Sequence, residues 1–190
     1  MANKVLFGIS NLHVGTWTEV TTTSGTTVTM GTPYHQKGAV SMSPSEANEK
    51  SDFYADDILY YSSFAGGTFE GDLEVAMFDD TFKTTYLGYV TLTNGGIAVK
   101  KNATKPKVYI AFEVQGDAEK RRVVFYNCEF GAITRSYSTI TETKEPQTET
   151  ISFTAAGDNV TGVTMATFKP TDSGYNSLFT SPTAPVISTT

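Results

Sequence analysis

The chain has 190 residues and a formal net charge of -6 at pH 7, a length that fits one domain whose core needs no disulfide staples. This acidic balance argues against a nucleic-acid reader, which would carry a basic stripe. No apolar stretch approaches membrane-spanning length and the first residues lack the pattern of a signal peptide, so we expect a protein made in a cytosol with no membrane partner.

Alternating polar and apolar residues recur from Lys4 to about Phe168, and Thr, Ser, Gly and β-branched residues dominate these runs. Turn signals such as Ser24-Gly25, Gly66-Gly67 and Gly116-Asp117 separate them. Such runs between turn residues are typical of β-strands. We therefore predict one all-β domain over residues 1–169, mainly β with one short helix.

A polar excursion interrupts the alternation from Gly31 to Gly38 and resumes from Ser43 to Lys50. Both stretches hold too few apolar residues to belong to a core. We predict a long loop over Pro33 to Lys50, and long loops usually carry function or contacts.

The next segment contains a short motif that suggests metal chemistry. Tyr54-Ala55-Asp56-Asp57 matches the pattern with which reverse transcriptases hold two metal ions. A polymerase also needs a third carboxylate and basic template contacts, which this acidic chain does not supply. We favour a turn that contains Asp56 and Asp57 after the aromatic pair Phe53 and Tyr54, and we predict no catalytic activity.

The most informative stretch is Phe69 to Phe78, where acidic residues alternate with apolar ones. Successive side chains of a strand point to opposite faces. Glu70, Asp72 and Glu74 are therefore expected to form a negative ladder, while Phe69, Leu73, Val75 and Met77 enter a core. A solvated strand face explains the pattern most simply, and such a face repels polyanions.

One helix is predicted from Asp80 to Leu87. Asp79 is placed to cap the free amides of the first turn, and Gly88 suits the C-terminal cap. Phe82 and Tyr86, four residues apart, share one face. A helix this short needs tertiary packing to be stable.

Two hairpins follow the helix. Asn94-Gly95 lies between two apolar runs and tolerates the positive φ of a tight turn. A second hairpin is expected to join Val108–Val114 to Arg122–Tyr126 across residues 116–120. The segment 150–155 alternates like a further strand and stays within the domain.

The residue types that commonly build reactive sites are sparse. Cys128, the single cysteine, shares parity with Val124, Tyr126 and Phe130 and is predicted to be a core thiol. Neither His13 nor His35 has partners at metal-ligand spacing. No phosphate-binding glycine loop or dinucleotide fingerprint is present, so we predict no metal and no cofactor.

The last segment differs in composition from the rest of the chain. Residues 170–190 combine prolines, Ser and Thr with scattered apolar residues such as Tyr175, Leu178 and Phe179. We predict an extended C-terminal arm that is disordered until it docks.

Several segments in order resemble the major tail protein (tail tube protein) family of long-tailed, siphovirus-type phages that infect Gram-positive bacteria. The resemblance covers roughly Lys4 to Phe168 and departs from the family in the Thr-rich passage 16–29 and in the C-terminal arm. The segments that carry it are 5–13, 38–43, 53–56, 60–61, 69–76, the helix region to Gly88, 94–95, 105–106, 112–113, 124–128, 144–145 and 147–150.

The resemblance implies a virion protein with a β-sandwich or barrel-like tail tube fold. Its subunits would close into hexameric rings, with inner sheets joining into a β-barrel lumen, and the rings would stack into a tube for DNA ejection. Implied partners are further copies of the chain, a tape-measure protein, and tail terminator and distal tail proteins. DNA would pass transiently without adhering, and assembly would take place in the host cytoplasm.

Within this framework the acidic ladder of Glu70, Asp72 and Glu74 is expected to face the lumen and repel phosphate. The two termini and the predicted loop are expected to contact the next ring. The loop residues assigned to this contact are Pro33, Tyr34, His35, Gln36, Lys37, Ser45, Glu46, Asn48, Glu49 and Lys50.

An alternative function is a carbohydrate-binding or adhesin-type β-sandwich module. It would use Tyr60, Tyr61 and Trp17 as stacking platforms for a saccharide. Aromatic residues are nevertheless more common in cores and at subunit interfaces. A stable monomer that binds glycans would favour this alternative.

Overall fold

The computed structural model describes residues 8–23, 25–55, 57–139 and 146–188 and, within these, the side chains outside 48–55, 59 and 62–65. The prediction of an all-β chain with one short α-helix is confirmed. The strands are β1 (Gly8–Thr22), β2 (Gly25–Met30), β3 (Tyr34–His35), β4 (Ala39–Ala55), β5 (Ile58–Val75), β6 (Val90–Thr91), β7 (Ile97–Ala98), β8 (Val108–Gln115), β9 (Arg122–Arg135), β10 (Glu149–Ala156) and β11 (Met165–Phe168). The helices are α1 (Asp80–Tyr86) and the 3₁₀-helix η1 (Ser177–Phe179).

One large antiparallel sheet organises the molecule, in the order β2-β1-β8-β9-β10-β5-β4. β3 pairs with β1, and β11 pairs with the first half of β9. The described strands do not close into a barrel, so β2 and β4 remain at the ends of the sheet. The barrel lumen therefore stays a prediction about several subunits together.

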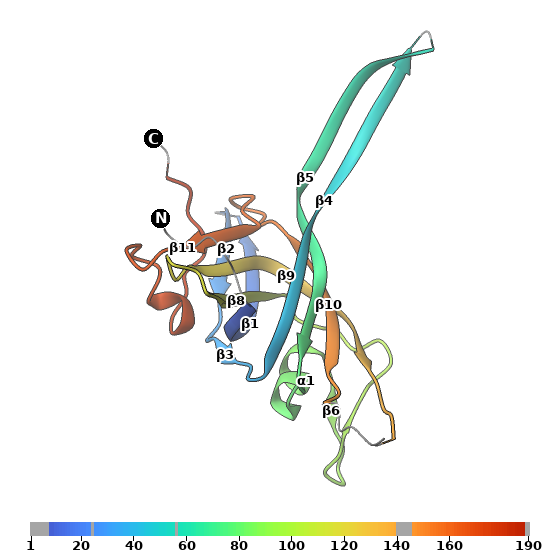
Figure 1. Cartoon of the computed structure of the whole chain (residues 1–190), viewed down its shortest axis with the longest axis vertical. Helices are drawn as coiled ribbons and strands as arrows, with labels where there is room; N and C mark the ends of the chain where they lie inside the picture. Colours follow the sequence, from blue (N-terminus) through green and yellow to red (C-terminus); the bar gives the residue numbers. More distant parts are fainter. Residues whose placement is uncertain (1–7, 24, 56, 140–145, 189–190) are drawn as a thin grey trace.

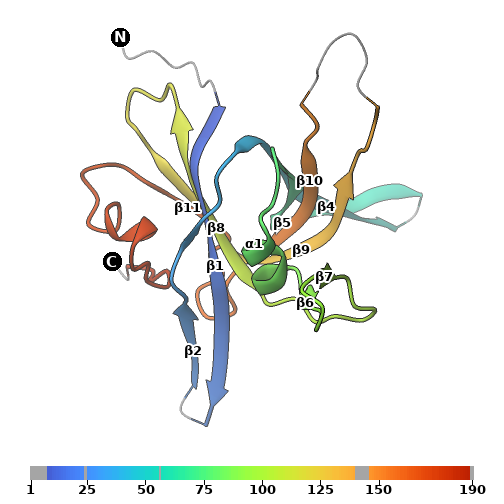
Figure 2. The same ribbon diagram turned by 90° about the horizontal axis from the view of Figure 1, so that it is seen from below.

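The main core lies between two halves of this curved sheet. Leu12 and Val14 of β1, Val108 and Ile110 of β8, and Leu73 of β5 are fully buried in it. Figure 2 shows α1 between the β1–β8 half and the β10–β5 half. The helix thus closes the core at one end, which supplies the tertiary packing that so short a helix needs.

The residues predicted to cap the two ends of α1 are confirmed. The side chain of Asp79 accepts a hydrogen bond from the amide of Phe82 at 2.8 Å. Gly88 follows the helix with φ +69°, a conformation that glycine adopts without steric cost. The carboxylate of Asp79 also accepts a hydrogen bond from the Tyr34 hydroxyl, so the cap ties the helix to β3.

A second apolar cluster occupies the opposite face of β1, β8 and β9. Trp17, Tyr109 and Tyr126 are buried there, together with Leu178 of η1. β8 is consequently covered on both faces, which explains its continuous run of apolar residues.

Cys128 is buried in the core as predicted, but the face that it was predicted to share with Val124 and Tyr126 is wrong. Asn127 has a φ of 49°, and the pairing of β8 with β9 shifts register beside it. This bulge reverses the alternation. Tyr126 therefore enters the second cluster, and Cys128 joins Phe130 in the main core.

Both predicted hairpins are present. β8 pairs with β9 across the turn at Gly116, which has φ +75°. β6 pairs with β7, but only Gly95 of Asn94-Gly95 has a positive φ. The two-residue turn with positive φ at both positions is therefore not formed. The turn expected at Gly66-Gly67 is also wrong, because β5 continues through it.

The prediction that residues Pro33 to Lys50 form a long loop is wrong. Tyr34 and His35 form β3, and Ala39 to Ala55 form the edge strand β4, which pairs with β5 along its length. Figure 1 shows β4 and β5 extending together as a hairpin well beyond the body of the molecule. The polar stretch 43–50 therefore lies in a strand rather than in a loop.

The segment after Pro170 differs from the arm that its composition predicts. Residues 170–180 form turns and η1 rather than an extended chain, and Leu178 is buried against Tyr126 and its neighbours. Residues 182–188 have no regular structure, and Val186 is 89% exposed. The boundary at residue 169 stays a prediction.

Candidate functional site

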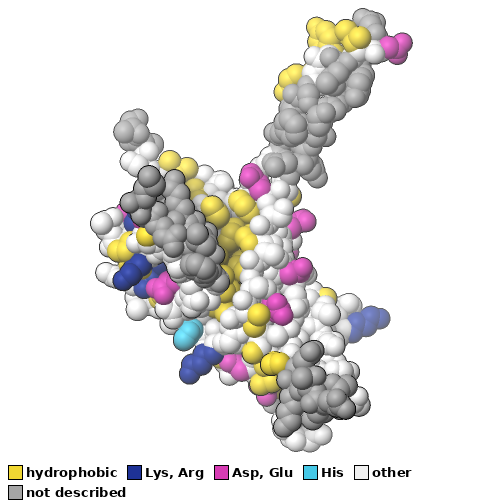
Figure 3. Space-filling view, in the orientation of Figure 1, with side chains coloured by type: hydrophobic (Ala, Val, Ile, Leu, Met, Phe, Trp, Pro, Cys, Tyr) yellow, Lys and Arg dark blue, Asp and Glu magenta, His cyan; other side chains and the backbone are white. Residues whose placement is uncertain are grey.

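Three strands present a continuous polar surface, here called the acidic face. Its middle column is the predicted ladder on β5, and each acid stands between two hydroxyl side chains on the neighbouring strands. Figure 3 shows acidic side chains in a broken line along β4 and β5. The three rungs are Ser41, Glu74 and Thr150; Ser43, Asp72 and Ser152; and Ser45, Glu70 and Thr154.

The opposite side of β5 anchors this face to the core. Leu73 and Val75 are fully buried, and Phe69 packs partly against the same cluster. Alternation within the strand is therefore confirmed for these residues. Met77 does not enter the core as predicted; it is 66% exposed because β5 ends at Val75 and the chain turns toward α1.

The acidic face contains no cationic side chain, since none of its nine positions is Lys or Arg. Glu74 accepts hydrogen bonds from Thr148 Oγ1 at 2.6 Å and Ser41 Oγ at 2.9 Å. These two hydroxyls lower the pKa of Glu74 below its ordinary value. Glu70 and Asp72 have no hydrogen bond or ion pair with any described residue, so their charge faces outward.

The end of the β4–β5 hairpin carries exposed apolar residues. Ile58, Tyr60 and Tyr61 are 62%, 74% and 61% exposed, and we call these residues with Asp57 the tip. Asp57 lies in the turn with φ 59°, as predicted, whereas Asp56 lies outside the described residues. Trp17 is only 3% exposed in the second cluster, so it is not placed to stack on a sugar beside Tyr60 and Tyr61.

The residues predicted to contact the next ring fall on different elements. Around β3, Tyr34 donates to Asp79 and Gln36 Nε2 donates to Met77 O at 3.1 Å, so both make contacts within the subunit. Ser45 and Glu46 are exposed on β4. Asn48, Glu49 and Lys50 lie in β4 with side chains outside the described part. The inter-ring role of the set stays a prediction.

A pocket of about 480 Å³ lies between the α1–β7 region and β9, and sequence reasoning missed it. We call it the basic pocket. Its lining combines apolar side chains with three cations, and the run Val99-Lys100-Lys101 was the available signal. The lining residues used below are Leu87, Tyr89, Val99, Lys100, Lys105 and Arg135.

Two cations of the basic pocket are fixed by the fold. Lys105 Nζ donates to the carbonyl oxygens of Phe130, at 3.1 Å, and Gly131, and partial burial lowers the pKa of Lys105. Arg135 pairs with Glu149 at 2.7 Å and donates to the Tyr89 hydroxyl at 3.2 Å. Val99 is 69% exposed at the rim.

A column of stacked side chains holds the C-terminal segment. The His13 ring lies 4.7 Å from the His35 ring and 4.2 Å from that of Phe179, between centroids. Arg122 Cζ lies 4.2 Å from the Phe179 centroid and 3.9 Å from that of Tyr175. Cations over aromatic faces are attracted to the ring quadrupole, so this column clamps residues 175–179 onto β1 and β9.

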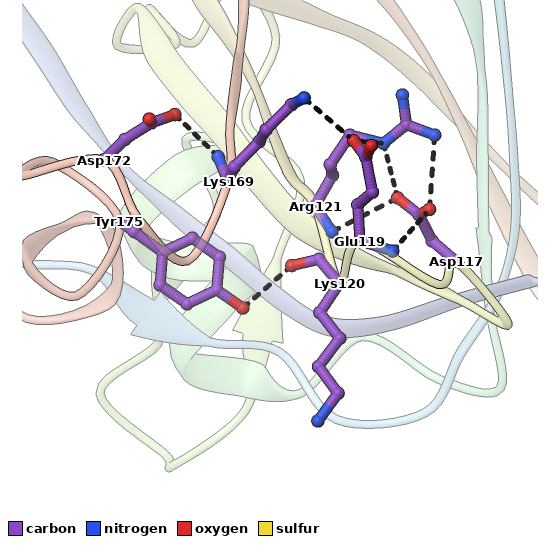
Figure 4. Close-up of polar contacts among 7 residues, drawn as sticks. All are labelled: Asp117, Glu119, Lys120, Arg121, Lys169, Asp172 and Tyr175. Atoms are coloured by element: carbon purple, nitrogen blue, oxygen red, sulfur yellow. Dashed lines mark hydrogen bonds and ion pairs between the residues drawn. The ribbon is translucent and has the colours of Figure 1, made fainter. Parts of the chain in front are cut away.

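Polar contacts continue this attachment at the β8–β9 turn (Figure 4). Lys169 Nζ lies 3.1 Å from Glu119, and the Tyr175 hydroxyl donates to Lys120 O at 2.9 Å. Arg121 Nε lies 2.5 Å from Asp117, and this hydrogen bond lowers the pKa of Asp117 to about 2. The segment after Lys169 is therefore attached by both stacking and charge.

Metal-binding clusters and membrane-spanning helices are both absent from the described part of the chain. No three His, Cys, Asp or Glu side chains there gather closely enough to hold a metal ion. No helix in the same residues is long and apolar enough to cross a membrane.

No family model and no curated protein matches the chain. Similar chains occur in solved structures of an anti-feeding prophage and of an extracellular contractile injection system. A chain in the anti-feeding prophage cap (tube terminating cap) has TM-score 0.47 and 10% identity and covers 88% of this chain and 95% of its own length. A chain in the extended sheath–tube complex of an extracellular contractile injection system gives the same four values.

The third similar chain, in the anti-feeding prophage baseplate, has TM-score 0.48, 7% identity, and coverage of 90% and 99%. At these identities and TM-scores the likeness carries no argument about function. The proposal that follows rests on the chain's own surfaces and sequence.

Proposed function

We propose that this chain is a structural subunit of a phage tail tube or a tail-derived particle, without catalytic activity. It self-assembles into hexameric rings that stack into a hollow tube, and the acidic face lines the lumen. The sequence resemblance to tail tube proteins motivates this proposal, and the geometry of the acidic face is the observation that supports it best.

A surface suited to DNA passage must avoid adhesion. Each cationic contact with a phosphate adds a salt-dependent binding term, and the nine positions of the acidic face supply no cation. The Ser and Thr side chains beside the acids are short, so they offer no long side chain that could enter a groove of the DNA. Glu70, Asp72 and Glu74 would repel the phosphate backbone and let it slide.

The sheet offers the means of assembly. β2 and β4 are edge strands in the single chain, and unpaired edges are templates for pairing with another chain. Edge pairing between copies would close a ring and satisfy these backbone groups. Stacking of rings through unlike faces gives an open filament, whose length another component, such as a tape-measure protein, must set.

The first test is electron microscopy with sedimentation at increasing protein concentration. We expect rings or hollow tubes of uniform width above a threshold concentration. A chain that stays monomeric at every concentration and binds glycans would contradict the proposal and favour the saccharide-binding module, for which the exposure of Tyr60 and Tyr61 is the supporting observation.

The lumen assignment has its own test. Tubes are assembled in the presence of short duplex DNA, then treated with nuclease and pelleted. Three chains are compared: the unmodified chain, Glu70→Gln/Asp72→Asn, and Glu70→Lys/Asp72→Lys. We expect retained DNA to increase in that order and to fall steeply with salt. DNA bound to the lysine variant yet fully digested would place the acidic face outside the lumen, while the neutral variant controls for assembly.

A further inference from the structure

The short hairpin of β6 and β7 stands apart from the main sheet. Each strand has two residues, and the pair forms a sheet of its own. Figure 2 shows this hairpin beside α1 and near β9. A two-stranded hairpin is marginally stable in water unless it packs against another part of the molecule. The basic pocket lies between the residues that flank this hairpin and β9.

Positive charge in and around the basic pocket exceeds the negative charge that the described residues supply there. Arg135 pairs with Glu149 at 2.7 Å, and Glu149 also pairs with Lys83 at 3.3 Å. One carboxylate therefore serves two cations. Lys100 and Lys105, which line the pocket, form no ion pair with any described residue. This local excess in a chain of net charge -6 favours the binding of an anion.

The ammonium group of Lys105 is held in place with one donor to spare. Its Nζ donates to the carbonyl oxygens of Phe130, at 3.1 Å, and Gly131, whereas an ammonium has three N–H donors. Partial burial lowers the pKa of Lys105, because the ammonium loses contact with water and no described carboxylate pairs with it. A bound anion would supply the missing counter-charge.

The rest of the lining indicates the kind of anion. Leu87, Val99 and Tyr89 give the pocket apolar and aromatic walls, and its volume of about 480 Å³ is typical of small-molecule sites. Planar recognition of phosphate commonly uses a free arginine fork, but Arg135 already donates to Glu149 and to the Tyr89 hydroxyl. The lining therefore fits a carboxylate on an apolar body better than a phosphate.

We propose that the basic pocket binds a small organic acid, with its carboxylate at Lys100 and Lys105 and its apolar body against Leu87 and Val99. Such a ligand would connect the residues around β6 and β7 to β9. It would stabilise this end of the molecule, because a ligand that binds only the folded chain raises its stability. The inference concerns a single subunit and is independent of the proposed function.

Phenylbutyrate is the probe, since it carries one carboxylate on an aromatic body. Its neutral amide, phenylbutyramide, has nearly the same shape and is the matched control ligand. Calorimetric titration of the full chain is expected to give a dissociation constant below about 1 mM for the acid. The amide and inorganic phosphate are each expected to bind at least about tenfold more weakly, since each lacks one of the two features that the pocket recognises.

Four variants locate the binding site of the probe. Lys105→Gln, which keeps a side-chain donor for the backbone carbonyls, should weaken binding of the acid at least about tenfold. Lys100→Gln, at an exposed lysine, should weaken it about threefold. Ala132→Trp, at an exposed residue of the lining, fills the pocket without removing a charge and should abolish binding. Lys101→Gln, at an exposed lysine outside the lining, is the matched control.

The contrary outcomes are distinct. Equal binding of acid and amide would overturn the anion site, as would a dissociation constant for the acid above about 1 mM. Unchanged affinity in Lys105→Gln and Ala132→Trp, or an equal loss in Lys101→Gln, would also overturn it. Acetyl-glycyl-phenylalanine presents the same chemistry at the end of a peptide. If it bound more tightly than phenylbutyrate, the pocket would be a site for the carboxyl end of a protein chain, and the small acid would be excluded.

Discussion

At the scale of single residues, side chains were predictable where a local rule decides their role. Asp79 and Gly88 obey capping rules that depend on a few neighbouring residues, and the structure has them as expected. The face of Cys128 was not predictable, because strand parity says nothing about a bulge. Only the positive φ of Asn127 reveals it, and asparagine tolerates that conformation without demanding it.

The stacked column makes His13 a pH-sensitive residue. Burial, then repulsion from His35 and Arg122, lowers the pKa of His13 below 6.5, against the opposing effects of the Asn11 carbonyl and Glu113. The neutral ring is therefore favoured in the folded chain. Its contribution to stability is complete above pH 6.5 and is lost as the pH falls through the folded-state pKa.

We expect His13→Phe, which keeps a stacking ring without a titratable group, to reduce the loss of unfolding free energy between pH 7 and pH 5. Chemical denaturation at both pH values measures this, and an NMR titration of the unmodified chain locates the pKa of His13. A His13 resonance that titrates above pH 6.5 would contradict the prediction.

At the scale of elements, strands with one buried face could be predicted from the sequence, whereas strands with no buried face could not. Residues 69–75 alternate because Leu73 and Val75 meet a core. The polar stretch 43–50 of β4 has no such contrast, and Pro44 within it also argues against a strand. Pro44 is tolerated because β4 is an edge strand. The basic pocket was missed for a related reason, since it is assembled from residues distant in sequence.

The cap of α1 gives a prediction at this scale. Asp79→Ala removes the acceptor of both the Phe82 amide and the Tyr34 hydroxyl. We expect a loss of about 1–2 kcal/mol in the free energy of unfolding, measured by urea denaturation. Asp80→Ala, which removes only a first-turn charge, should cost less than about 1 kcal/mol. Equal effects of the two changes would contradict a capping role.

At the scale of the whole molecule, the C-terminal segment shows what composition alone leaves undecided. Its apolar residues are few and scattered, which favours disorder in isolation. The outer face of β1, β8 and β9 supplies the missing partner surface, and Leu178 is buried on it. The all-β class was predictable from patterns along the chain, whereas this docking depends on a surface formed by other strands.

Leu178 tests whether segment and domain unfold together. Leu178→Ala is expected to lower the free energy of unfolding by about 2–3 kcal/mol, while Val186→Ala, at an 89% exposed residue, should have little effect. Trp17, the single tryptophan, lies in the same cluster and reports the transition by fluorescence. If hydrogen exchange changes only in residues 170–188 and the global transition stays fixed, the segment is a separate unit.

The long pairing of β4 with β5 also has a mechanical consequence. The two strands run together along the long axis from the tip to the body (Figure 1), joined by backbone hydrogen bonds across the sheet. Tension applied along that axis is carried by the two covalent backbones in parallel, so the hairpin resists stretching far better than sideways bending. The projecting hairpin is therefore stiff along its length and compliant across it.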